Sequence, residues 1–174
     1  MISTETYYHI YNHANGDDNL FREEKNYDFF LEKCHRHIDP VAEFIACGLM
    51  PNHLHLLVKI KSEDEVTSTF PKFGTLEKLE DRSNFVSKQF SNFFSSYTQA
   101  FNKIYQRRGS LFIKNFKRKA VTSESYLSQL ILYIHLNPVK HGFAADFEEW
   151  KYSSFHYFPE VNPKLMEWIF GTRE

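Results

Sequence analysis

The sequence has little of what marks secreted, membrane-spanning or disordered proteins. Its 174 residues include two cysteines, Cys34 and Cys47, which are too few for a disulfide framework and are not spaced as a metal or redox pair. The N-terminal MISTETYYHI lacks the charged start and apolar stretch of a secretory signal, and no apolar run is long enough to span a membrane. Glycine and proline are scarce, at six each, and aromatic residues reach 17%, which argues against disorder. We expect a soluble protein of the cytoplasm.

Net charge is also nearly absent, at −1, so the overall charge does not indicate a polyanionic partner. The distribution of charge does, because the segment 101–119 holds seven lysines or arginines, no acidic residue and several interleaved aromatic rings. Basic side chains bind phosphates and rings stack on unpaired bases, so this composition predicts a surface for single-stranded nucleic acid. A solvated basic face is the alternative. The candidate DNA-binding residues are Lys103, Arg107, Arg108, Phe112, Lys114, Phe116, Lys117, Arg118 and Lys119.

Hydrophobic periodicity predicts the element order β-α-β-β-α-β-α. Turn and cap signals divide the elements: Pro51-Asn52 joins two strands into a hairpin, and Ser123 is a plausible N-cap of the last helix. The expected strands are 7–13, 41–50, 53–60 and 116–121, and the expected helices are 23–38, 86–107 and 123–138.

This order predicts an α+β fold, a ferredoxin-like antiparallel sheet with helices packed against one face. A single domain spans 1–174, with a C-terminal extension from about residue 143. Residues 61–84 show no clear period, so we expect a long connection there with at most one helical turn.

The stretch MPNHLHLLVKI places two histidines, His53 and His55, one residue apart on an aliphatic strand. Because side chains alternate along a strand, both imidazoles lie on one face, and the other face is filled by Leu54, Leu56, Val58 and Ile60. We expect the histidines on the open face of the sheet, as two ligands of a metal site. Two solvated strand residues are the alternative, because a metal needs a third ligand.

The last helix carries candidate partners for the histidines. At 100° per residue, Tyr126, Tyr133 and Asn137 lie on one flank of its apolar stripe, and Tyr133 and Asn137 are one turn apart. A phenol beside a carboxamide could place a nucleophile next to a metal-coordinating oxygen. Alternatively, Tyr133 packs at the edge of the core and Asn137 caps the helix end.

Four blocks in succession, MPNHLHLLV, RRGSLFIKNFKRKAV, YIHLNPVKHGF and WKYSSFHYF, resemble those of the HUH single-tyrosine transposases. The branch that the chain most resembles is the REP-associated tyrosine transposases. The resemblance covers most of the chain in order, and NHLHLLV together with YIHLNPVKHG is its specific part. The segment 61–84 departs from the compact members of the family.

The resemblance implies a site and a reaction. His53 and His55 match the metal-binding pair, Asn137 matches a further polar ligand, and Tyr133 matches the nucleophile on a helix beside the histidine strand. Imidazoles by themselves would allow zinc, but the family's chemistry implies Mg²⁺ or Mn²⁺. The implied activity is cleavage and rejoining of single-stranded, hairpin-containing DNA through a 5′-phosphotyrosine intermediate.

Two other functions remain open at the level of sequence: a catalytically idle binder of single strands or hairpins, and a metal-dependent phosphodiesterase in which Tyr133 is structural. Tyr126, Tyr152 and Tyr157 are competing candidates for the nucleophile. Members of this superfamily can be dimers, which makes a homodimer an open expectation.

Overall fold

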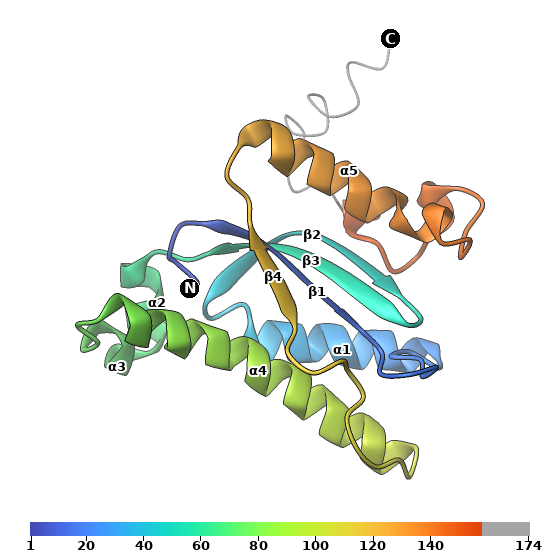
Figure 1. Cartoon of the computed structure of the whole chain (residues 1–174), viewed down its shortest axis with the longest axis horizontal. Helices are drawn as coiled ribbons and strands as arrows, with labels where there is room; N and C mark the ends of the chain where they lie inside the picture. Colours follow the sequence, from blue (N-terminus) through green and yellow to red (C-terminus); the bar gives the residue numbers. More distant parts are fainter. Residues whose placement is uncertain (158–174) are drawn as a thin grey trace.

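The computed structural model describes residues 1–157. Four strands form one antiparallel sheet in the order β2-β3-β1-β4 (Figure 1). The strands are β1 (Tyr7–His13), β2 (Ala42–Met50), β3 (His53–Ile60) and β4 (Lys117–Ala120). The helices are α1 (Glu24–His37), α2 (Glu63–Thr69), α3 (Pro71–Gly74), α4 (Leu79–Ile104) and α5 (Glu124–Lys140), followed by the short 3-10 turns η1 (Phe147–Glu149) and η2 (Ser154–Tyr157). The predicted α+β class and the order of the main elements are confirmed.

The turn and the helix cap expected from the sequence are present in the structure. Pro51 and Asn52 form the tight turn of the β2–β3 hairpin, so that Met50 pairs with His53. The hydroxyl of Ser123 accepts a hydrogen bond from the backbone N–H of Tyr126 and caps α5. These two signals fix the beginning of the histidine strand and of the helix that faces it.

The sheet has helices on both faces (Figure 1). Helices α1 and α4 cover one face, where the main core gathers aliphatic side chains of β3 such as Leu54 and Leu56 with Phe30, Phe90 and Phe93. Helix α5 lies across the other face. The expectation of an open face at the histidines is therefore wrong, because α5 covers them.

A small apolar cluster holds α5 on the sheet, and its members are Ala46, Leu57, Val121, Leu130, Ile131 and Ile134. The helix approaches β2 closely at Gly48, where an added Cβ would lie 2.9 Å from the backbone oxygen of Ile134. The position of α5 on the sheet thus depends on the absence of a side chain at Gly48 as well as on this apolar cluster.

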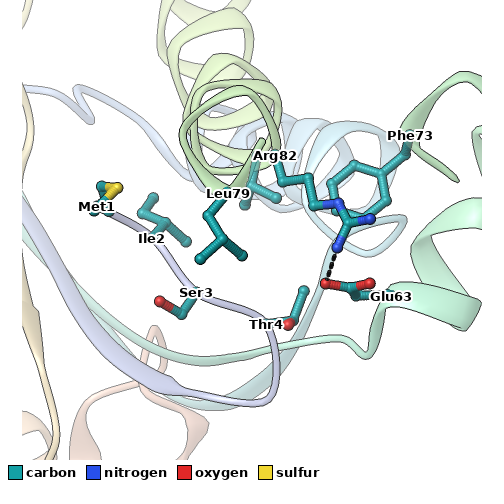
Figure 2. Close-up of a pocket in the computed structure, with 9 residues that line it drawn as sticks. Met1, Ile2, Ser3, Thr4, Glu63, Phe73, Leu79 and Arg82 are labelled. Carbon is teal, nitrogen blue, oxygen red and sulfur yellow. Dashed lines mark hydrogen bonds and ion pairs between the residues drawn. The ribbon is translucent and has the colours of Figure 1, made fainter. Parts of the chain in front are cut away.

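The segment 61–84 differs from expectation, since it is mostly helical. Helices α2 and α3 occupy its first part and α4 begins at Leu79, seven residues before the expected start at Val86. An ion pair between Arg82 and Glu63 joins α4 to α2 beside the N-terminal residues (Figure 2). Strand β3 begins at His53, and α2 follows its last residue, Ile60. Helices α2 and α3 therefore lie at the end of the strand away from His53.

The residues after α5 return to the outer edge of β2. The Trp150 Nε1–H donates to the backbone oxygen of Leu49 at 3.0 Å, and Ser153 forms a bridge with Gly48. The ring of Tyr152 stacks on Tyr27 of α1, with 3.5 Å between centroids. This tail shields an otherwise free sheet edge. Within residues 1–157 no helix is both long and apolar enough to cross a membrane.

Candidate active site

His53 and His55 lie side by side between the sheet and α5. Both point to the same face of β3, as the alternation of the strand requires, and their side chains are buried, at 2% and 4% exposed. Their ring centroids are 5.4 Å apart. The bland alternative of two solvated strand residues is wrong, because α5 removes both from water.

Helix α5 brings Tyr133 and Asn137 to these two histidines. The ring of Tyr133 meets that of His55 edge-on, with 5.3 Å between centroids, and one turn later Oδ1 of Asn137 lies 2.9 Å from Nε2 of His53. Tyr133 is 37% exposed, whereas Asn137 is fully buried. A phenol that solvent can reach therefore stands beside a buried imidazole–amide pair. The ammonium of Lys140 lies over the Tyr133 ring, 5.2 Å from the ring centroid.

Strand β1 adds a third buried imidazole that the sequence did not single out. Nε2 of His9 lies 2.9 Å from Nδ1 of His55. Burial lowers the pKa of His55 to about 2, with the nearby His9 and His53 adding to the shift. Burial, assisted by the charge of Lys119, also lowers the pKa of His9 to about 4. Both rings are neutral at neutral pH, which is the form that binds metals.

The donor set fits a divalent cation. Nδ1 of His53 lies 2.7 Å from Oδ1 of Asn52, and its Nε2 faces Oδ1 of Asn137. A neutral imidazole has a single N–H, so one of these contacts sets two lone pairs against each other. A cation shared by Nε2 and the amide oxygen would make that contact favourable, and donors 2.9 Å apart match neighbouring ligands of an octahedral ion with bonds of about 2.1 Å.

The amide of Asn137 is compatible with a cation and also with a hydrogen bond to His53. Its Nδ2 is buried and no described residue accepts a hydrogen bond from it. Turning the amide over would let Nδ2 donate to His53, which gives the site a second self-consistent arrangement without a cation. Within residues 1–157 no three His, Cys, Asp or Glu side chains form a metal-binding group. A cation at His53 and His55 would therefore need a further ligand of another kind, such as the amide oxygen of Asn137.

A cleft of about 530 Å³ opens from the histidines toward solvent. Tyr133 and His55 line it together with Tyr126, Gln129 and Lys119. The Lys119 ammonium lies 4.7 Å from the ring centroid of Tyr126. A strand of nucleic acid in this cleft would meet ring faces, an amide and a cation beside the phenol.

The structure divides the basic segment of the sequence into exposed and structural residues. Lys103, Arg108, Lys114, Lys117, Arg118 and Lys119 are exposed and Phe116 is half-buried. Arg107 instead donates to Asp18 at 2.8 Å and to the backbone oxygen of Ser110 at 2.9 Å, which holds the loop after α4 in place. Phe112 is 5% exposed and packs edge-on against Phe94 in the core. The expectation that Phe112 stacks on bases is corrected by this burial.

The competing tyrosines lie in different surroundings. Tyr126 lines the cleft, and its ring lies under the Lys119 ammonium. Tyr152 stacks on α1, and its hydroxyl is buried. The side chain of Tyr157 lies outside the described residues. Of the tyrosines expected from sequence, Tyr133 is the one whose ring contacts both His55 and His9.

Sequence reasoning missed three histidines around the site. His9 contacts His55, while the rings of His13 and His141 lie 4.8 Å and 4.7 Å from that of His53. The alternation of YYHIYNH already placed His9 and His13 on one face of their strand. The missing information was the pairing of β1 with β3, which sets Tyr11 opposite His55 and His13 opposite His53.

Comparisons with known proteins find similar chains. A putative REP-associated tyrosine transposase of Haemophilus influenzae is 28% identical over 116 residues, covering 66% of this chain. The chain matches 59% of the length of that relative. A solved structure of a REP-associated tyrosine transposase bound to a REP hairpin superposes with a TM-score of 0.61, over 90% of this chain and 79% of the other, at 20% identity. No family model matches the chain. The chain is therefore similar in sequence to a REP-associated tyrosine transposase and similar in fold to another.

Proposed function

We propose that the protein is a DNA strand transferase that cleaves and rejoins single-stranded, hairpin-containing DNA through a 5′-phosphotyrosine at Tyr133. The observation that carries this proposal is the position of a 37%-exposed phenol against buried His55, one helical turn from Asn137 and in the lining of a cleft. A nucleophile, a set of ligands and a route for the substrate meet at one place.

The reaction exchanges one phosphodiester for another. The Tyr133 oxygen attacks the phosphorus in line with the leaving 3′ oxygen, a P–O bond to tyrosine forms and the P–O3′ bond breaks. The phenolic proton leaves to solvent and the 3′ oxygen gains one, so no other reactant is consumed. A 3′ hydroxyl of another strand can reverse the step, which accounts for both cleavage and rejoining.

The cation in this proposal is Mg²⁺ or Mn²⁺, held by His53, His55 and Asn137. When bound, it supplies positive charge to a non-bridging phosphate oxygen. His9 occupies Nδ1 of His55, so a proton on that Nδ1 leaves Nε2 free as a ligand. Lys140, over the Tyr133 ring, and Lys119, over the Tyr126 ring, attract the phosphates of the bound strand.

The decisive experiment compares covalent capture of DNA by the wild type and by the Tyr133→Phe variant. Single-stranded oligonucleotides from a hairpin library are incubated with the protein and Mn²⁺, and adducts are mapped by mass spectrometry. The variant should bind DNA like the wild type and form no adduct, because it lacks only the hydroxyl. The matched control, Tyr126→Phe, removes the same atom from another tyrosine that lines the cleft and should keep the adduct.

The same experiment separates the other functions. Hairpin binding without any adduct in the wild type would indicate an idle binding module. Metal-dependent turnover without an adduct would indicate a phosphodiesterase that activates water. An adduct on Tyr126, or one that persists in Tyr133→Phe, would refute the assignment of the nucleophile.

A further inference from the structure

The segment 147–157 lies against both α5 and the edge of β2. Most of it belongs to WKYSSFHYF, a block of the sequence to which the proposed function assigns no role. Ser153 forms a β-bridge with Gly48, and Gly48 in turn pairs with His55 in the register of β2 and β3. Backbone contacts therefore fix this segment relative to the strand that carries the histidines.

Ser154 joins β2 to α5. Its hydroxyl oxygen accepts a hydrogen bond from the backbone N–H of Cys47 at 2.8 Å and lies 2.9 Å from Nε2 of His135 on α5. A hydroxyl can serve two such partners at once, because it has one donor and two lone pairs. His135 is 1% exposed, and the ring of Phe155 meets it edge-on with 5.7 Å between centroids. The segment thus holds a buried imidazole of the helix that carries the candidate nucleophile.

His135 and the residues of the candidate site project from opposite flanks of α5. Ile134 packs against β2 at Gly48. At 100° per residue, Tyr133 and His135 project about 100° to either side of Ile134, and Asn137 lies on the Tyr133 side, about 60° from it. A contact that fixes the His135 flank therefore also fixes where the opposite flank points.

A small rotation of α5 about its axis would displace the functional groups. A helix with its side chains has a radius of about 5–6 Å, so a rotation of about 10° moves a side-chain tip by about 1 Å. The apolar cluster beneath α5 opposes such a rotation only weakly, because hydrophobic contacts are not directional. A hydrogen bond has a preferred distance and angle, so the contact between His135 and Ser154 is suited to fix the rotation.

We propose that His135 and Ser154 are positioning residues, which fix the rotation of α5 and so hold Tyr133 and Asn137 at the histidines. The segment 147–157 is then part of the framework of the active site as well as a cover for the sheet edge. The purpose of this positioning rests on the proposed function, but the positioning itself can be measured without DNA.

The test measures geometry by NMR and reaction by single-turnover capture of a hairpin oligonucleotide that the wild type captures with Mn²⁺. His135→Leu and Ser154→Ala remove the contact, whereas His135→Gln retains a side chain that can donate to or accept from the Ser154 hydroxyl. The wild type should show a nuclear Overhauser effect between the rings of Tyr133 and His55, whose centroids are 5.3 Å apart. This signal should weaken in His135→Leu and in Ser154→Ala and return in His135→Gln.

The capture rate at saturating DNA should follow the same order. We expect it to fall about tenfold to a hundredfold in His135→Leu and Ser154→Ala, because the phenol is misplaced, and to stay within about threefold of wild type in His135→Gln. The control is Tyr97→Phe, which removes a buried hydrogen bond to the backbone oxygen of Leu20 on the opposite face of the sheet. It should lower the melting temperature and change neither the ring signal nor the rate.

Several outcomes would overturn the proposal. An unchanged ring signal in both His135→Leu and Ser154→Ala would show that α5 keeps its rotation without this contact. Equal losses in His135→Gln and His135→Leu would show that the hydrogen bond is not what positions the helix. Rates that fall with the melting temperature in every variant, Tyr97→Phe included, would reduce the contact to a structural role. If the wild type captures no DNA but the ring signal changes as expected, the proposed reaction fails and the positioning by His135 and Ser154 stands.

Discussion

Gly48→Ala tests whether close packing of α5 positions the candidate nucleophile. The added Cβ would lie 2.9 Å from the backbone oxygen of Ile134, where ordinary van der Waals contact begins at 3.4 Å, so the helix or the strand must shift. Overpacking of this kind costs about 1–3 kcal/mol. Because Tyr133 precedes Ile134, the shift also moves the phenol relative to His55, and a misplacement of about 1 Å can cost about a hundredfold in rate.

The assay for this variant is the initial rate of covalent DNA capture together with thermal unfolding. We expect a rate about tenfold to a hundredfold below wild type, and a melting temperature lower by about 2–12 °C. Cys47→Ala is the control, since Cys47 pairs with Leu56 and lies on the opposite face of β2. It should lower stability without slowing capture. Wild-type rate and stability in Gly48→Ala would refute the close approach of α5 to the strand.

Three further predictions follow from the site and the loop after α4. His53→Ala should abolish binding of Mn²⁺, measured by calorimetry, while circular dichroism stays like wild type; unchanged Mn²⁺ affinity would place the ion elsewhere. Arg107→Ala should lower the free energy of unfolding by about 1–3 kcal/mol, because the charged contact to Asp18 is lost; an unchanged urea midpoint would contradict its structural role. His9 and His55 have pKa values of about 4 and about 2 in the folded state, below the unfolded 6.5, so their contribution to stability is full above pH 6.5 and falls as the pH drops. In the presence of chelator, each histidine should make the free energy of unfolding about 2 kcal/mol lower at pH 5 than at pH 8, as measured by urea unfolding. A His9→Gln variant should show a smaller loss.

Much of this fold follows from local pattern. The alternation in β3 determined that His53 and His55 share a face, and the spacing in α5 determined that Tyr133 and Asn137 share a flank. Cap and turn residues such as Ser123 and Pro51 marked boundaries because their conformational preferences act within a few residues. The sequence did not predict the helices in 61–84, since α2 and α3 are too short to show a hydrophobic period.

Tertiary structure decided what these local patterns could not. The burial of His53 and His55 depends on α5 crossing the sheet, and the contact of His9 with His55 depends on β1 pairing with β3. Both are pairings between segments distant in sequence, which hydrophobic periodicity does not specify. The same holds for the basic segment, where composition determined the charge. Only packing decided that Phe112 belongs to the core while Lys119 faces the cleft, because burial is a property of the assembled chain.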